Sequence, residues 1–152
     1  MYPIRDCLEH SAVQCSRPGI WTRFYLTVKY NGGNAYQCRA NFNLLDSNDE
    51  CIYHLDFRVD QKNIVQAEKL NGKWIMEVMA DMPELKAINV VIVQLTPEKY
   101  YDVIMNDGRL NTRYPVKMDR LKLYQGISIN FKQGACLTID LDQSFMVTHG
   151  EF

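Results

Sequence analysis

Polar and apolar residues alternate along residues 52–59, IYHLDFRV, and this period of two predicts a β-strand with two unlike faces. The even-numbered residues share one face: Ile52, His54, Asp56 and Arg58. The odd-numbered residues share the other face and are apolar or aromatic: Tyr53, Leu55, Phe57 and Val59. We therefore expect the odd face to pack on a core, and the even face to present an imidazole, a carboxylate and a guanidinium in a row.

Two more strands are predicted next, on either side of a tight turn at Asn71-Gly72. The stretch before this turn contains the helix-favouring run QAEKL, but the β-branched pair Ile64-Val65 favours a strand. Trp74 and Glu77 follow the turn and lie close in sequence to the polar row. Together these residues favour a ligand-binding surface over a catalytic centre.

The rest of the chain predicts short strands at intervals of about 8–12 residues, a pattern typical of an all-β sandwich or barrel. The remaining predicted strands are 1–7, 21–30, 38–45, 87–95, 100–105, 113–116, 127–131 and 136–141. Residues 87–95 are nearly all apolar, so we expect burial of both their faces. Asn106-Asp107-Gly108 predicts the turn of a hairpin, since Asp-Gly favours a type I′ turn, Gln125-Gly126 predicts another turn, and residues 148–152 predict a loose tail.

The chain has 152 residues, of which 47% are hydrophobic, and this suits a single domain over residues 1–152. The formal net charge is -1, so we expect neither nucleic acid nor an anionic membrane as a partner, since both attract a basic surface. The sequence contains no apolar run of 18 or more residues, so we expect no transmembrane helix and no insertion into a membrane. The first residues lack the apolar centre of a secretory signal, which leads us to expect a cytoplasmic protein.

Cysteine spacing predicts free thiols. The chain has five cysteines: Cys7, Cys15, Cys38, Cys51 and Cys136. The odd number, the lack of a CxxC pair and the lack of a signal sequence favour thiols in a reducing compartment over structural disulfides. The three histidines are scattered without ligand spacing, so neither a metal site nor another cofactor is expected. The sequence contains neither a nucleophile–base pair nor a phosphate loop. We therefore expect no catalytic residues and no enzyme.

The spacing of the polar residues resembles that of the galectins, a family of soluble β-galactoside-binding lectins. The galectin surface carries the patterns H-x-N-x-R, V-x-N and W-G-x-E-x-R, and the corresponding segments here are 54–58 (HLDFR), 65–67 (VQA) and 74–79 (WIMEVM). The resemblance extends over residues 20–141. It implies a galectin-like jelly-roll sandwich of two antiparallel sheets.

The resemblance implies that five residues contact carbohydrate: His54, Asp56, Arg58, Trp74 and Glu77. Trp74 suits stacking on the C–H face of galactose, although a core tryptophan is the alternative from the residues alone. His54 can donate from one ring nitrogen and accept at the other. Arg58 and Glu77 are expected to form an ion pair that also contacts sugar oxygens.

Three positions depart from the galectin pattern. Asp56 and Ala67 stand where the family has asparagine, and Met79 stands where it has arginine. A carboxylate only accepts hydrogen bonds, so we expect Asp56 to pair with Arg58 and to compete with sugar for the guanidinium. Each buried polar group left unpaired costs about 1–3 kcal/mol. The resemblance therefore implies altered or weakened binding of lactose-type ligands.

Two functions remain open. The first is a lectin domain that recognises galactose-containing glycans or glycoproteins. The second is a galectin-like protein-interaction module that has lost galactoside binding, with Tyr25 and Tyr30 on the candidate surface for a protein partner. The resemblance is also consistent with a homodimer, and with export from the cytoplasm by an unconventional, signal-peptide-independent route.

Overall fold

Eleven strands form the framework of the part of the chain that the computed structural model describes, residues 1–9, 15–36, 38–48 and 50–152. The strands are β1 (Tyr2–Pro3), β2 (Arg23–Tyr30), β3 (Arg39–Asp46), β4 (Cys51–Arg58), β5 (Asn63–Leu70), β6 (Lys73–Asp81), β7 (Ile88–Leu95), β8 (Tyr100–Met105), β9 (Gly108–Pro115), β10 (Tyr124–Phe131) and β11 (Leu137–Val147). The short helices are η1 (Ile4–Cys7), η3 (Val59–Gln61) and α1 (Met118–Leu121).

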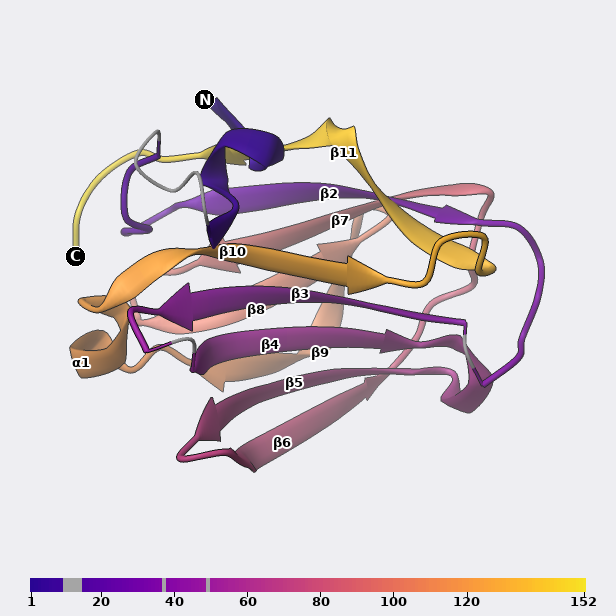
Figure 1. Cartoon of the computed structure of the whole chain (residues 1–152), viewed down its shortest axis with the longest axis horizontal. Helices are drawn as coiled ribbons and strands as arrows, with labels where there is room; N and C mark the ends of the chain where they lie inside the picture. The colour runs from indigo at the N-terminus through magenta and orange to yellow at the C-terminus, as the bar shows by residue number, and fades with distance from the viewer. Residues whose placement is uncertain (10–14, 37, 49) are drawn as a thin grey trace.

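The strands form two antiparallel sheets that pack face to face (Figure 1). The six-stranded sheet has the order β1-β11-β2-β7-β8-β9, and the five-stranded sheet has the order β10-β3-β4-β5-β6. The prediction of an all-β sandwich is confirmed. The stretch with helix-favouring residues is the strand β5, as its β-branched pair indicated.

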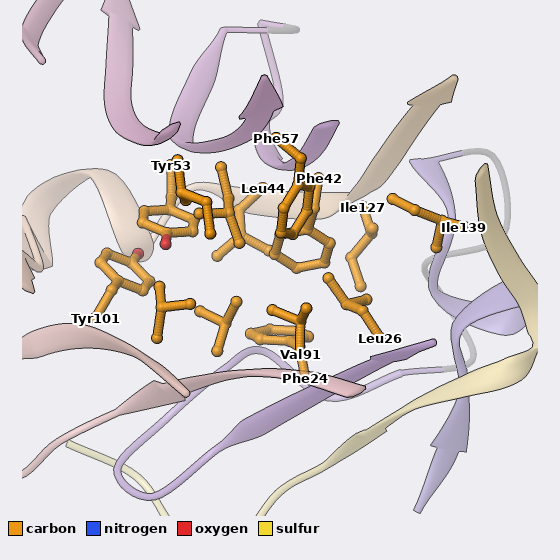
Figure 2. Close-up of a cluster of buried hydrophobic side chains, with 14 of the residues drawn as sticks. Phe24, Leu26, Phe42, Leu44, Tyr53, Phe57, Val91, Tyr101, Ile127 and Ile139 are labelled. Carbon is orange, nitrogen blue, oxygen red and sulfur yellow. The ribbon is translucent and has the colours of Figure 1, made fainter. Parts of the chain in front are cut away.

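The core lies between the two sheets, where the apolar face of β4 meets the inner face of the six-stranded sheet (Figure 2). Tyr53, Leu55 and Phe57 are each at most 1% exposed, so the predicted inward face of β4 is confirmed for these residues. Tyr53 stacks on Tyr101 of β8 with ring centroids 4.0 Å apart. Burial of a side chain of this size contributes about 1.5–3 kcal/mol to stability.

Ile52 does not lie on the polar face to which strict alternation assigned it. Its side chain is 3% exposed and belongs to the core cluster. The pairing of β3 with β4 shifts at this point, because Leu44 pairs with Tyr53 whereas Leu45 pairs with Cys51. Ile52 is the extra residue of this bulge, so the predicted alternation holds only from Tyr53 onward.

Both hairpin turns use residues with positive φ, as a type I′ turn requires. Asn71 and Gly72 have φ values of 51° and 77° between β5 and β6. Asn106 and Asp107 have φ values of 49° and 70° between β8 and β9. The hairpin predicted at Asn106-Asp107-Gly108 is confirmed. Its central pair is Asn106-Asp107 and not Asp107-Gly108, because Gly108 is already the first residue of β9.

The strand β7 is not buried on both faces. Ile88 is 61% exposed and Val90 is 46% exposed on the outer face of the six-stranded sheet. These residues pair with Lys29 and Thr27 of β2, which face the same side. The prediction failed because a run of apolar residues does not show which alternate positions another layer covers.

Four further segments differ from the prediction. The edge strand expected at residues 1–7 is limited to β1, and η1 follows it. Gly126 lies at a bulge inside β10 and not in a turn. The strand β11 continues to Val147 and pairs with β1 and β2, beyond the expected end at residue 141. The helix α1 has four residues, too few to produce a helical period in the sequence.

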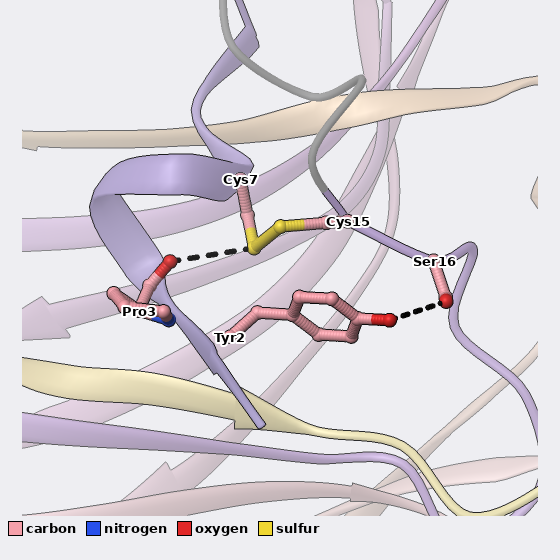
Figure 3. Close-up of a disulfide and its surroundings, with 5 residues drawn as sticks. All are labelled: Tyr2, Pro3, Cys7, Cys15 and Ser16. Carbon is pink, nitrogen blue, oxygen red and sulfur yellow. Dashed lines mark hydrogen bonds between the residues drawn. A yellow bond between two sulfur atoms is a disulfide. The ribbon is translucent and has the colours of Figure 1, made fainter.

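Two disulfides contradict the prediction of free thiols. Cys7 is bonded to Cys15 (Figure 3), and Cys38 is bonded to Cys136. Cys51 is a buried free thiol, which accounts for the odd number, and burial raises its pKa to about 12. The spacing could not reveal the second bond, because the fold brings together two residues 98 positions apart.

No helix in the described residues is long and apolar enough to cross a membrane.

Candidate functional site

The outer face of the five-stranded sheet gathers the polar residues of β4. Antiparallel pairing places His54 between Asn43 of β3 and Ala67 of β5. Asp56 and Arg58 follow at alternate positions, and their odd-numbered neighbours face the core, so all three polar side chains point outward. Neighbouring side chains cover this row well, since His54 is 8% exposed and Asp56 is 7% exposed.

A one-residue bulge interrupts β6 beside this row. Gln66 pairs with Val78, but Glu68 pairs with Ile75, so β6 has one residue more than β5 between the two pairs. Met76 has a φ of 53° within the bulge. Its sulfur lies 3.4 Å from the ammonium of Lys117, next to α1. Met76 is therefore the extra residue, and its side chain is directed away from the polar row.

The bulge brings Trp74 and Glu77 to the same face of the sheet. Strict alternation would place these residues on opposite faces, because they are an odd number of positions apart. With Ile75 and Val78 paired to inward-facing residues of β5, their neighbours Trp74, Glu77 and Met79 face outward. The structure thus gathers on one face the five residues that the sequence singled out, from two strands.

The imidazole of His54 is held in one orientation by Asn43. The amide nitrogen of Asn43 donates to Oδ1 of Asn41 at 2.8 Å and to the carbonyl of Ser128 at 3.4 Å. The amide oxygen of Asn43 is therefore an acceptor, and it contacts Nδ1 of His54. Nδ1 must carry the proton, which leaves Nε2 of the neutral ring with an accepting lone pair.

Burial lowers the pKa of His54 to about 4. The nearby carboxylate of Asp56 opposes this shift, whereas the positive charges of Arg58 and Lys69 reinforce it. Because this pKa lies well below 7, the ring is neutral under physiological conditions. Its Nε2 can therefore accept a hydrogen bond from a hydroxyl group.

Trp74 is a surface residue, and its 45% exposure excludes the alternative of a core tryptophan. Its ring centroid lies 4.4 Å from that of His54, with the two planes tilted by 42°. The ammonium of Lys69 lies 5.2 Å from the centre of the indole ring, within the range of a cation–π contact. The indole is thus fixed from two sides while almost half of its surface remains open.

Asp56 and Arg58 form the ion pair that the sequence predicted. Nε of Arg58 donates to Oδ2 of Asp56 at 2.8 Å. The expected pair between Arg58 and Glu77 is not formed, and within the described residues the side chain of Glu77 makes no hydrogen bond or ion pair. Across the sheet, Arg58 pairs with Asn63 of β5, and Asn63 pairs with Asp81 of β6. Glu77 lies four residues along β6 from Asp81, or roughly 13 Å, and is therefore displaced along the sheet from Arg58.

The sequence reasoning missed four polar residues that extend the site toward β10. They are Asn41, Asn43, Ser128 and Asn130. Nδ2 of Asn130 donates to Oδ1 of Asn41 at 3.0 Å and to the hydroxyl of Ser128 at 3.2 Å. The available signal was the alternation in ANFNL and SINF, where polar residues alternate with apolar ones just as they do in β4.

The outer face thus combines an open aromatic ring with a row of donors and acceptors. A ligand with an apolar face and several hydroxyl groups matches this combination, because one side can stack while the edges form hydrogen bonds. Among the described residues, no group of three or more His, Cys, Asp or Glu is placed to hold a metal ion.

Comparison with known proteins identifies the family. The sequence profile of the galactoside-binding lectins matches residues 26–135, which is most of the chain. The protein belongs to the galectin family. No curated protein sequence matches the chain. The galectin profile covers all the strands of the site, from β3 through β6 and β10.

Solved galectins share the fold at low sequence identity. Galectin LEC-6 of Caenorhabditis elegans is 14% identical, with 82% of each chain covered and a TM-score of 0.63. A variant of human galectin-16 is 12% identical, with 88% of this chain and 92% of that chain covered and a TM-score of 0.69. A tetrameric galectin from the sponge Cinachyrella is 12% identical, with 90% of this chain and 96% of that chain covered and a TM-score of 0.64. This galectin chain is therefore a jelly-roll domain of a carbohydrate-binding, non-enzymatic family.

Proposed function

We propose that the outer face of the five-stranded sheet binds galactose-containing glycans or glycoproteins with weakened or altered affinity. The observation that carries this proposal is the pairing of a neutral His54, whose Nε2 is free to accept, with the half-exposed ring of Trp74 at 4.4 Å. Galactose presents hydroxyl groups on one side and C–H bonds on the other, so it can use both groups at once.

The polar neighbours would contribute hydrogen bonds at the edge of the sugar. Arg58 supplies donors and Asp56 supplies acceptors on the same face as His54. Glu77 is exposed and has a carboxylate available on the Trp74 side of the face. These five residues form the proposed contact set, since they share one surface and offer both kinds of hydrogen-bonding group.

Weak affinity follows from how the same residues are already engaged. Nε of Arg58 is bonded to Asp56, so sugar oxygens must compete with a carboxylate for the guanidinium. Ala67 and Met79 bring no hydrogen-bonding group of the kind that asparagine and arginine supply. Two or three lost partners, at about 1–3 kcal/mol each, weaken binding by one to several powers of ten.

A titration with lactose, followed by calorimetry and by two-dimensional NMR, tests this proposal. We expect saturable shifts that map to β4 and β6, with a dissociation constant above about 0.1 mM. Trp74→Ala should abolish the shifts and leave the spectrum of the fold intact, whereas Trp21→Phe, at a residue outside the site, should change neither. NMR spectra that stay unchanged at about 50 mM lactose would contradict lectin activity toward galactosides.

The exposed apolar residues of β7 favour a second function, that of a protein-interaction module. Ile88 and Val90 lie on the outer face of the six-stranded sheet, and Tyr25 lies on the same face, stacked on Phe145 at 5.2 Å. Tyr30 does not belong to this surface, because it packs against the core. Blank glycan arrays, together with partner recovery that Val90→Ser abolishes, would favour this function over the first.

We also propose that the protein acts outside the reducing cytosol. Two disulfides among four of the five cysteines are typical of proteins in oxidising compartments. This favours the exported form of the protein over the cytoplasmic one. Mass spectrometry of the protein from the culture medium and from the cell lysate, after alkylation of free thiols, should find only Cys51 labelled in the exported protein.

A further inference from the structure

The tip of the β5–β6 hairpin carries part of the proposed site but lacks support from the neighbouring strand. Pairing between β4 and β5 runs from Arg58–Asn63 to His54–Ala67 and ends there. Lys69 lies beyond this end and pairs only across the hairpin, with Trp74. The position of Trp74 on the face must therefore depend on contacts other than the β4–β5 ladder.

Arg120 of α1 supplies such a contact. Its Nη2 donates to the backbone carbonyl of Lys69 at 2.7 Å. The guanidinium also lies 3.7 Å from the carboxylate of Glu50, and that carboxylate accepts from the backbone N–H of Asn71 at 2.9 Å. One side chain from α1 and one from the segment before β4 thus hold the backbone where β5 ends and the turn begins, at Lys69 and Asn71.

A buried ionic cluster fixes Arg120 in this place. Glu68 points inward from β5 and is 1% exposed. Its carboxylate lies 2.8 Å from the ammonium of Lys117 and 3.3 Å from Nη1 of Arg120. Figure 1 shows α1 at the same end of the sandwich as the β5–β6 turn. Because a buried carboxylate without its partners is strongly unfavourable, the cluster ties α1 to β5.

Consecutive residues of β5 link this cluster to the site. Glu68 faces inward to Arg120, and Lys69 faces outward, with its ammonium 5.2 Å from the ring centre of Trp74. We propose that Arg120 is a positioning residue that holds Trp74 in place for carbohydrate through the backbone of Lys69. This role deepens the proposed lectin function and rests on it, because Trp74 is the group that the sugar would stack on.

Fluorescence of Trp74 tests the role without requiring a sugar. The chain has two tryptophans, so Trp21→Phe leaves Trp74 as the only indole. In this background we compare Arg120→Gln, the double variant Glu68→Gln with Arg120→Gln, and the control Arg113→Gln. Arg113 is a matched control, since it also pairs with a buried carboxylate, Asp102, but on the other sheet.

The double variant separates positioning from stability. Arg120→Gln leaves the buried carboxylate of Glu68 with Lys117 as its one remaining ion-pair partner among the described residues. The double variant removes that buried charge, so denaturant unfolding should show that it regains part of the stability that Arg120→Gln loses. It still lacks the bond to the carbonyl of Lys69. We therefore expect both variants to shift the emission of Trp74 to longer wavelength and to raise its quenching by acrylamide, while Arg113→Gln changes neither.

Lactose binding provides the second readout. We expect the dissociation constant of both Arg120 variants to rise by about fivefold or more, and that of Arg113→Gln to stay within about twofold. Emission of Trp74 that is unchanged in Arg120→Gln, or restored in the double variant, would overturn the positioning role. If the parent protein binds no lactose, the proposed function fails, and the fluorescence comparison still decides whether Arg120 positions Trp74.

Discussion

The bond between Cys38 and Cys136 offers the sharpest test of what stabilises the sandwich. Cys38 comes directly before β3 of the five-stranded sheet, and Cys136 comes directly before β11 of the six-stranded sheet. The bond therefore links the two sheets covalently. Replacing both cysteines by alanine removes this link without leaving an unpaired thiol.

The expected loss follows from the length of chain that each disulfide encloses. A cross-link between residues 98 positions apart restricts the unfolded chain by about 4–5 kcal/mol in the loop-entropy treatment. The bond between Cys7 and Cys15, with a separation of 8, contributes about 2.5 kcal/mol by the same relation. The Cys38/Cys136 double variant should therefore lose about 2 kcal/mol more than the Cys7/Cys15 double variant.

Urea unfolding followed by circular dichroism measures both losses, provided that each variant unfolds in a single transition. Adding a thiol reductant to the parent protein should lower its stability toward that of a variant without either bond. Equal losses in the two double variants, or a loss below about 1 kcal/mol for Cys38/Cys136, would refute the argument from loop length.

Three further outcomes are expected. Asp56→Asn should free Arg58 and supply an amide donor, so calorimetry should find lactose binding tighter by about tenfold; weaker binding would contradict the competition between Asp56 and sugar. The pKa of His54 is about 4 in the folded protein, against 6.5 for the free side chain. The unfolded chain therefore binds the proton first, and stability should fall by about 2–3 kcal/mol as the pH drops from 6.5 to 4, a component that His54→Gln should lack in matched unfolding curves. Ile88→Thr should change the unfolding free energy by less than about 0.5 kcal/mol, and a loss above about 2 kcal/mol would show that this position is buried in solution.

Alternation in the sequence predicted the two faces of β4 because a strand repeats every two residues. The rule gave Tyr53, Leu55 and Phe57 to the core, as observed. It failed at Ile52, where a bulge adds one residue to the strand. Alternation is local, and a bulge depends on how the partner strand is aligned, so the residues of one strand do not reveal it.

The common face of Trp74 and Glu77 could not be derived from alternation at all. Predicting this common face required the galectin pattern, in which the tryptophan and the glutamate have the same spacing as Trp74 and Glu77. That pattern does not explain why β6 has an extra residue between them. The expected pair between Arg58 and Glu77 failed for the related reason that a shared face does not fix the distance along it. The partner of Arg58 is Asp56, two positions away on the same strand.

Pairings between distant parts of the chain were beyond the reach of the sequence. The joining of Cys38 to Cys136 and of Arg120 to Glu68 depends on the way the two sheets are stacked. The composition even pointed the other way for the cysteines, because an odd number suggested that none was bonded. Such contacts are properties of the folded arrangement and leave no periodic signal.

The bulge at Met76 has a consequence for how separate molecules meet. The strand β6 is the last strand of its sheet, so its outer backbone groups are open to another chain. A regular edge of nine residues would invite a second molecule to add a strand and to continue the sheet. The left-handed backbone at Met76 breaks that edge into two short pieces. We therefore expect the same inserted residue that directs Trp74 and Glu77 to one surface to disfavour the addition of a further strand at this edge.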